Sequence, residues 1–118
     1  MKSKKIFTLS TCSTCKKILG DLDTSKCEIQ DIKQQSISGN DLDFMKELAG
    51  SYEALFSRRA NKYKDLKLKD KNLTEKDYRK LILDEYTFLK RPVIVVGKKI
   101  FIGNTNAQVT AAQKELNV

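Results

Sequence analysis

The sequence has no histidine, a single proline and only three cysteines, Cys12, Cys15 and Cys27. A structural zinc site needs about four ligands, and a chain without histidine, with two neighbouring cysteines and one distant one, does not supply them. The odd number of cysteines also argues against a disulfide framework. Long hydrophobic runs are missing as well, since residues 93–96 and 100–102 are far too short to span a bilayer. We therefore expect no metal site and no membrane partner.

A leader sequence is not evident either. Residues 1–5 are basic, but only a strand-length apolar run follows, and no small-residue cleavage site is visible. We therefore expect a cytoplasmic protein whose cysteines stay reduced unless its own chemistry oxidises them. The composition, with 40% hydrophobic and 32% charged residues in a chain of 118, is typical of one folded domain.

Acidic residues are fewer than basic ones. The chain carries 23 Lys and Arg against 15 Asp and Glu, a formal net charge of +8. This balance favours anionic partners, namely nucleic acids, acidic proteins or small oxyanions, although lysines on helix faces also serve solubility. The basic residues are scattered as pairs, without the aromatic platform that binders of single strands use. We therefore expect no direct binding of nucleic acid.

The first third of the chain has the pattern of a β-α-β unit. Residues 5–9 predict a strand, and residues 10–14 predict a polar connection. From Cys15 onward, apolar residues recur at helical spacing, at positions 15, 18, 19 and 22. Residues 26–32 predict a second strand, in which Ile29 shares one face with Cys27 and Asp31.

The middle of the chain predicts helices. The spacing of a capping box begins at Ser38 and again at Thr74, and a third box begins at Thr105 near the end of the chain. Between the first two boxes, residues 52–66 are basic and predict helix in part.

The last third predicts a hairpin followed by a helix. Pro92 directly precedes the apolar residues 93–96, as the first residue of a strand allows, and a turn at residues 97–99 leads into a second apolar run. The resulting order is β-α-β, a helical middle and β-β-α. This order predicts an α/β, thioredoxin-like fold, a single domain over residues 1–118 with a helical insertion at about residues 38–88.

Cys12 and Cys15 lie three positions apart, between the first strand and the first helix. Cys12 precedes the helix, where unpaired N–H groups and the helix dipole stabilise a thiolate, and Lys16 and Lys17 add positive charge. Cys15 lies on the apolar face within disulfide reach. We predict that Cys12 is the nucleophile and that Cys15 either resolves a bond made by Cys12 or is a core residue. Cys27 is interpreted as a small buried hydrophobic residue.

Three arginines are candidates for binding an anion beside Cys12. Arg91 directly precedes Pro92, and in a thioredoxin-like fold the turn before this strand faces the start of the first helix. Arg58 and Arg59 precede a helical stretch, where the alternative is a solvated helix end. The forked donors of arginine suit a tetrahedral oxyanion better than the point charge of lysine.

At these positions the chain resembles the arsenate reductase family of the glutaredoxin-like type (ArsC) and the related Spx regulators, over nearly its whole length. The resemblance rests on three stretches: Cys12-Ser13-Thr14-Cys15-Lys16-Lys17, Leu55-Phe56-Ser57-Arg58-Arg59 with Tyr63-Lys64-Asp65-Leu66, and Leu89-Lys90-Arg91-Pro92-Val93-Ile94-Val95. It implies that Cys12 is the nucleophile and that Arg91 and either Arg58 or Arg59 bind the oxyanion. Pro92 matches the position that this fold holds in cis.

Two positions depart from the arsenate reductase pattern. Those enzymes carry a further arginine in the last hairpin, where this chain offers Gly103 or Asn104, and they have serine where this chain has Cys15. Spx proteins have a C-x-x-C pair and a glycine in that hairpin.

The resemblance implies a thiol-dependent oxidoreductase without a metal or organic cofactor. The Cys12 thiolate would attack arsenate or another oxidised substrate, held by Arg91 and by Arg58 or Arg59. Lys16 and Pro92 are the other residues that we predict to bind the substrate. The reductant would be glutathione with glutaredoxin, or thioredoxin acting through Cys15. The alternative is an Spx-like transcriptional regulator, switched by oxidation of the cysteine pair, that binds RNA polymerase.

Overall fold

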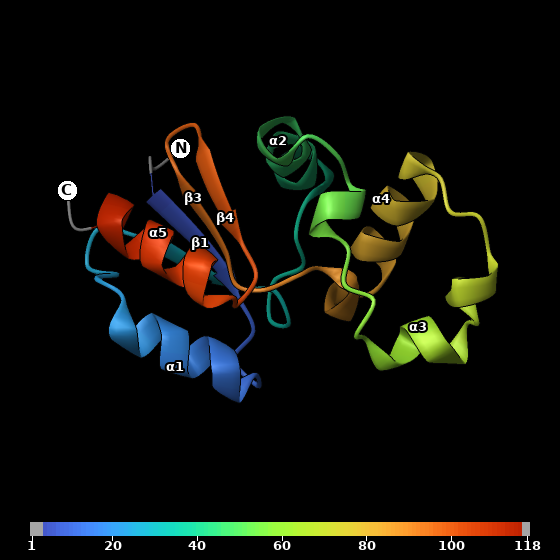
Figure 1. Ribbon diagram of the computed structural model, residues 1–118, viewed down its shortest axis with the longest axis horizontal. Coiled ribbons are helices and arrows are strands. Elements are labelled where there is room, and N and C mark those ends of the chain that lie inside the picture. Colours follow the sequence, from blue (N-terminus) through green and yellow to red (C-terminus); the bar gives the residue numbers. More distant parts are fainter. Residues whose placement is uncertain (1–3, 117–118) are drawn as a thin grey trace. The chain divides into compact units, whose positions relative to one another are not determined.

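The computed structural model describes residues 4–116 and consists of two compact units (Figure 1). One unit joins the chain up to Gln35 with the chain from Arg91 onward, and the other is Ser36–Lys90. The predicted helical insertion, at about residues 38–88, falls within the second unit. The assignment of residues 1–118 to a single domain stays a prediction.

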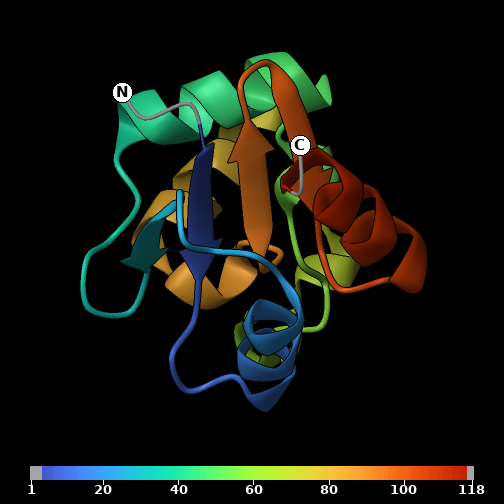
Figure 2. The same cartoon turned by 90° about the vertical axis from the view of Figure 1, so that its left-hand side faces the viewer.

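The first unit contains a four-stranded mixed sheet. The unit consists of six elements: β1 (Lys4–Thr8), α1 (Ser13–Asp21), β2 (Glu28–Asp31), β3 (Val93–Val96), β4 (Lys99–Ile102) and α5 (Asn106–Leu116). The strand order is β2-β1-β3-β4, with β1 parallel to β2 and antiparallel to β3 (Figure 2). β3 and β4 form the predicted antiparallel hairpin. This arrangement confirms the predicted α/β, thioredoxin-like halves, β-α-β and β-β-α.

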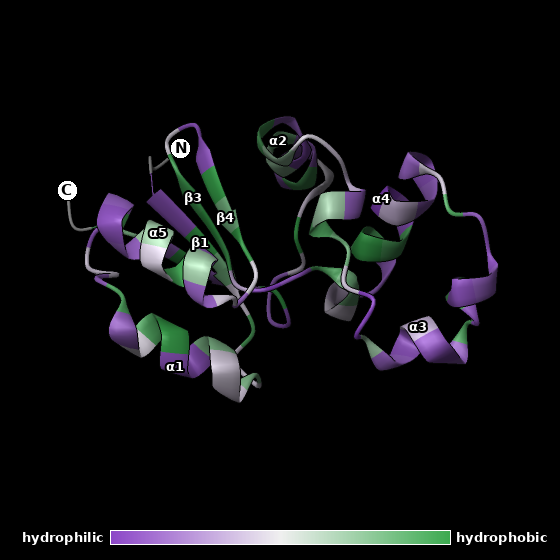
Figure 3. Cartoon of the chain, in the orientation of Figure 1, coloured by the Kyte–Doolittle hydropathy of each residue, from purple (hydrophilic) through white to green (hydrophobic). Residues whose placement is uncertain are grey.

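The core of the first unit lies between the sheet and its two helices. Ile6 on β1 and Ile94 on β3 pair across the sheet and are 0% and 2% exposed. They pack against Ile18 of α1, Leu22 directly after this helix, and Ala112 and Leu116 of α5, all of them buried. Figure 3 shows β3 as a hydrophobic strand, and its residues Val93, Ile94 and Val95 are buried. The packing fixes α1 directly after the end of β1.

The second unit is helical. Its elements are three α-helices and three short 3₁₀ helices, labelled η: α2 (Gly39–Ala49), η1 (Glu53–Leu55), α3 (Asn61–Asp65), η2 (Leu68–Asp70), α4 (Glu75–Asp84) and η3 (Tyr86–Phe88). The predicted caps are present, because Ser38 Oγ accepts from the Asp41 N–H at 3.0 Å and Thr74 forms a reciprocal capping box with Asp77. Between residues 4 and 116, no helix is both long and apolar enough to cross a membrane.

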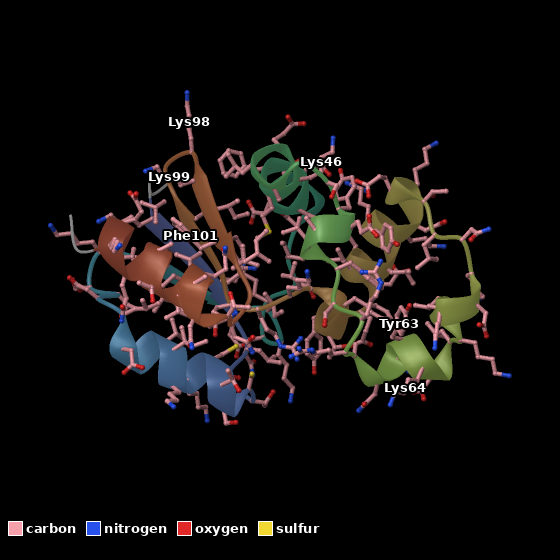
Figure 4. All side chains as sticks on the ribbon, viewed as in Figure 1. Lys46, Tyr63, Lys64, Lys98, Lys99 and Phe101 are labelled. Carbon is pink, nitrogen blue, oxygen red and sulfur yellow. The ribbon has the colours of Figure 1, made fainter. Side chains whose placement is uncertain are left out.

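An aromatic cluster around Phe56 holds the second unit together. The Phe56 ring stacks on Phe88 at 5.0 Å between centroids and tilts against Tyr78 at 4.9 Å. Tyr63 reaches the same ring from α3 at 6.1 Å, on the helix that also carries Lys64 (Figure 4). The cluster therefore ties α3, α4 and η3 to the segment that precedes Arg58.

The β3–β4 hairpin has polar side chains at its tip and a glycine at its base. Lys98 and Lys99 lie at the tip (Figure 4). Gly103 follows β4 with a φ of +88°, and its N–H donates to the Pro92 carbonyl at 3.0 Å. A left-handed backbone of this kind favours glycine. The hydrogen bond fixes the end of the hairpin to the residue that opens β3.

The position of Gly103 yields a stability prediction. Gly103→Ala should lower the free energy of unfolding by about 1 kcal/mol, because an L-residue is strained at positive φ. A Cβ there would meet no heavy atom within 4 Å, so steric overlap does not add to the cost. Urea unfolding monitored by circular dichroism measures the change.

Gly20→Ala is the matched control. Gly20 lies inside α1, and a Cβ at this position also meets nothing within 4 Å. Alanine favours a helix interior over glycine by up to about 1 kcal/mol, so this variant should be more stable than the wild type. If both substitutions lowered the free energy of unfolding equally, the cost at Gly103 would not come from its positive φ.

Candidate functional site

The candidate site begins at Cys12, the N-cap residue of α1. β1 ends at Thr8, and the chain turns sharply afterwards, because the Cys12 N–H donates to the Leu9 carbonyl at 3.0 Å. The Cys12 carbonyl then accepts the first helical hydrogen bond, from the Lys16 N–H at 3.1 Å. α1 starts at Ser13, two residues earlier than the apolar stripe indicated. Cys12 therefore stands directly at the helix N-terminus, as predicted.

The environment of Cys12 favours its thiolate. Partial burial alone would raise the pKa of Cys12, but several interactions outweigh it and lower this pKa below the ordinary cysteine value. The sulfur interacts with the backbone N–H and the thiol of Cys15, with the positive charge of Arg91 and with the Thr14 N–H. Since the thiolate is the reactive form of cysteine, Cys12 is suited to act as a nucleophile.

Cys15 has the opposite environment. Its side chain is buried, with 1% exposure, and burial raises the pKa of Cys15 above the ordinary value. The neighbouring Cys12 raises this pKa further, by accepting a hydrogen bond from the Cys15 thiol and by its negative charge. The Leu9 N–H and the Thr8 hydroxyl have smaller, opposite effects and lower the pKa of Cys15. The two thiols are thus adjacent and unequal, and all three cysteines are free in this structure.

Arg91 and Pro92 reach the same place from the other half of the chain. β3 runs antiparallel to β1, with Phe7 opposite Val93. Residues that precede β3 therefore lie at the end of β1 that leads to Cys12. The Arg91–Pro92 peptide is cis, as the family resemblance implied, and Pro92 is buried.

The first unit accordingly brings together four of the predicted site residues: Cys12, Cys15, Arg91 and Pro92. Lys16 is exposed on the first turn of α1. Among residues 4–116, no three Cys, Asp or Glu side chains are grouped in a way that could hold a metal ion.

Arg58 and Arg59 belong to the second unit and have different surroundings. Arg58 donates from Nη2 to Glu53 Oε2 at 2.8 Å and to the Tyr78 hydroxyl at 3.2 Å. Its guanidinium also lies over the Tyr78 ring, 5.9 Å from the centroid. The Arg59 side chain is exposed, and its guanidinium makes no hydrogen bond or ion pair with another described residue. Arg58 is thus engaged within its own unit, whereas Arg59 is available.

Thr8 is the residue at this site that the sequence prediction missed. Its side chain is 5% exposed at the end of β1, and its hydroxyl acts on Cys15. The available signal was a polar residue between the apolar Phe7 and Leu9, four positions before Cys12. A threonine is common in strands, so this signal alone did not indicate a role.

The sequence was compared with models of known protein families. The model described as the ArsC family matches residues 7–112. The chain belongs to the ArsC family. The match includes Cys12, Cys15, Arg58, Arg59 and Arg91 within its bounds.

Solved structures share the ArsC fold with this chain over almost their full length. A protein from Staphylococcus aureus COL is 29% identical, with a TM-score of 0.74, and the match covers 92% of this chain and 96% of that one. A Bacteroides fragilis protein described as ArsC family related is 24% identical, with a TM-score of 0.78 and coverage of 95% and 98%. An arsenate reductase from Vibrio cholerae is 19% identical, with a TM-score of 0.78 and coverage of 92% and 96%. No protein with a curated description matches the chain.

The lowered pKa of Cys12 predicts the order in which the thiols react. At neutral pH, brief treatment with iodoacetamide should alkylate Cys12 before Cys15 and Cys27, because burial raises the pKa of both other thiols. The rate at Cys12 should rise with pH and level off below the ordinary cysteine range. Peptide mapping by mass spectrometry gives the order, and preferential labelling of Cys27 would contradict it.

Proposed function

We propose that this protein is a thiol-dependent oxidoreductase of the arsenate reductase type, in which the Cys12 thiolate attacks arsenate or another oxidised substrate. The main support is the pairing of Cys12, whose pKa is lowered, with Arg91 at the residue before a cis proline. Membership of the ArsC family and the likeness to the Vibrio cholerae arsenate reductase agree with this chemistry. No metal or organic cofactor takes part in the proposed reaction.

The proposed reaction uses two thiols for one two-electron reduction. The Cys12 thiolate forms a bond to the arsenic of arsenate, and one arsenate oxygen leaves as water after protonation. A second thiolate then attacks the Cys12 sulfur. A disulfide forms, the sulfur–arsenic bond breaks, and its electron pair leaves with arsenic as arsenite. The arsenic is reduced from As(V) to As(III), and two thiols are oxidised to one disulfide.

Two sources of the second thiol are consistent with the geometry. Cys15 is adjacent to Cys12, so that its attack would give a Cys12–Cys15 disulfide for thioredoxin to reduce. Glutathione would instead give a mixed disulfide with Cys12, which glutaredoxin would reduce. Both reductants belong to the cytoplasm, the compartment we propose for this protein.

We further propose that Arg91 and Arg59 bind the oxyanion. Arg91 is supported by its electrostatic effect on Cys12. Arg59 is preferred over Arg58 because Arg58 is already paired with Glu53 and the Tyr78 hydroxyl, and releasing it would leave these partners unsatisfied. Lys16 and Pro92 remain predicted members of the same site.

The experiment that tests the function is arsenate-dependent thiol consumption, measured separately with glutathione and glutaredoxin and with thioredoxin. Cys12→Ser should abolish both routes, because it removes the nucleophile. Cys15→Ser should abolish the thioredoxin route and leave the glutathione route at least partly active, because an external thiol can attack the same adduct.

Two outcomes would contradict the proposal in different ways. Equal activity of Cys15→Ser with both reductants would make Cys15 a core residue without a role in turnover. No arsenate-dependent turnover by the wild type, together with retention of the protein on RNA polymerase in a pull-down, would favour the alternative of a redox-switched regulator.

The arginine assignments predict a graded result for three charge-conserving variants. Arg91→Lys and Arg59→Lys should each lower kcat/KM for arsenate on the order of tenfold, about 1.4 kcal/mol of transition-state stabilisation, because lysine cannot donate in two parallel bonds. Arg58→Lys is the matched control and should keep turnover near the wild-type value. Its pair with Glu53 is partly exposed, so its loss should cost less than about 1 kcal/mol of stability. A larger loss of turnover in Arg58→Lys than in Arg59→Lys would reverse the assignment.

A further inference from the structure

Thr8 carries a buried hydroxyl at the end of β1. The residue is 5% exposed, and its Oγ1 has no partner at hydrogen-bond geometry in the structure, in which Cys12 and Cys15 are both free. Its backbone carbonyl has a partner, because it accepts from the Ile32 N–H at 2.9 Å. A buried polar atom without a partner is costly, so a strand position of this kind would ordinarily hold valine. The unused hydroxyl therefore indicates a state of the site in which it has a partner.

The nearby group that would gain from this hydroxyl is the Cys15 sulfur. The Thr8 hydroxyl and the Leu9 N–H both lie within reach of that sulfur, and both lower the pKa of Cys15 against the larger effects of burial and of Cys12. A neutral thiol is a weak acceptor and needs no such donors. A thiolate buried at 1% exposure needs them, because water is excluded from it.

Cys15 requires these hydrogen-bond donors at one step of the proposed cycle, when it becomes a thiolate. While Cys12 is a thiolate, the Cys15 thiol donates to it and keeps its own proton. Once Cys12 is covalently bonded to a substrate or to glutathione, this acceptor is lost. Cys15 must then lose its proton before it can attack, and its charge develops next to Thr8 and Leu9.

We propose that Thr8 is a further catalytic residue, whose hydroxyl donates a hydrogen bond to the Cys15 thiolate as this thiolate attacks the Cys12 adduct. The inference rests on the proposed function of Cys15 as the resolving thiol. The titratable group that acts on Cys15 is Cys12, which no longer titrates in the adduct. The pH dependence of the attack therefore reports on Cys15 alone.

The attack can be observed without arsenate in a Cys27→Ala background. Cys12 reacts with the aromatic disulfide DTNB, which gives a mixed disulfide of Cys12 with thionitrobenzoate (TNB) and releases one TNB anion. After removal of excess reagent, the Cys15 thiolate attacks the Cys12 sulfur, the bond between that sulfur and TNB breaks, and a second TNB anion leaves with the electron pair. The product is the Cys12–Cys15 disulfide, and absorbance follows each release.

Thr8→Val removes the hydroxyl and keeps the shape of the side chain. Loss of one hydrogen bond to a charged group should raise the midpoint of the pH profile for the second release by about one pH unit. At neutral pH, the thiolate fraction falls about tenfold, while the more basic thiolate is about threefold more nucleophilic, which leaves a net slowing of about threefold. Above both midpoints, Thr8→Val should instead be about threefold faster than wild type. A merely structural defect would not make Thr8→Val slower than wild type at neutral pH and faster than wild type at high pH.

Two further variants complete the test. Thr8→Ser keeps the hydroxyl and should restore the wild-type profile, and Thr8→Ala removes it in a smaller side chain and should repeat the shift of Thr8→Val. The release of the first TNB anion should be unchanged in all three, which shows that Cys12 and the fold around it are intact.

The possible failures are distinguishable. A second release with the same rate and the same pH midpoint in wild type, Thr8→Val and Thr8→Ala would overturn the role of Thr8 and leave the resolving role of Cys15 standing. No second release by the wild type would overturn both, because Cys15 would then not attack the Cys12 adduct at all.

Discussion

The antiparallel pairing of β1 with β3 is the constraint on which the candidate site depends. Phe7 lies opposite Val93 in this register, so the end of β1 and the beginning of β3 meet at the same edge of the sheet. The chain that leaves β1 turns into α1 at Cys12, and the chain that enters β3 passes through Arg91 and the cis Pro92. Because Ile6 and Ile94 bury this pairing beneath α1 and α5, the site is supported by the core of the first unit.

The second constraint is the electrostatic coupling of the two thiols. The Cys15 N–H and thiol both act on the Cys12 sulfur, while burial and the charge on Cys12 keep the proton on Cys15. Two adjacent thiolates would repel each other in a poorly hydrated place, so the site holds one negative charge at a time. In the proposed cycle, a covalent bond at Cys12 removes its charge and allows Cys15 to ionise. The order of the two proposed steps thus follows from electrostatics.

Local signals were sufficient to predict most of the fold. The caps at Ser38 and Thr74 and the hairpin after Pro92 depend on residues close in sequence, and all three are confirmed. The third predicted box, at Thr105, forms only in part. Thr105 Oγ1 accepts from the Gln108 N–H at 3.3 Å, but Gln108 Oε1 accepts from the Ile102 N–H at 3.0 Å. The Gln108 side chain, which the local pattern assigned to the cap, is bound to the backbone of β4 instead.

The sequence pattern could not predict which face of a strand is buried or which distant residues pair. Ile29 is 47% exposed on β2, an edge strand, whereas Gln30 beside it is 7% exposed and donates to the Gln35 carbonyl. Alternation along a strand defines two faces but does not say which is covered. The choice between Arg58 and Arg59 was open for a similar reason, since it depends on Glu53 and on Tyr78, which is 20 positions away.

The two departures from the arsenate reductase pattern are physically related. Where that pattern has an arginine in the last hairpin, this chain has Gly103 or Asn104, and the Gly103 N–H donates to the Pro92 carbonyl. A site with one fewer cation binds an oxyanion less tightly and favours the Cys12 thiolate less strongly. In the proposed function, Cys15 offsets this loss at the second step, because a thiol already held beside the adduct needs no separate binding event. A buried thiol is slow to ionise, however, and this makes the donors around Cys15, rather than the cations around the substrate, the groups on which the rate of the second step depends.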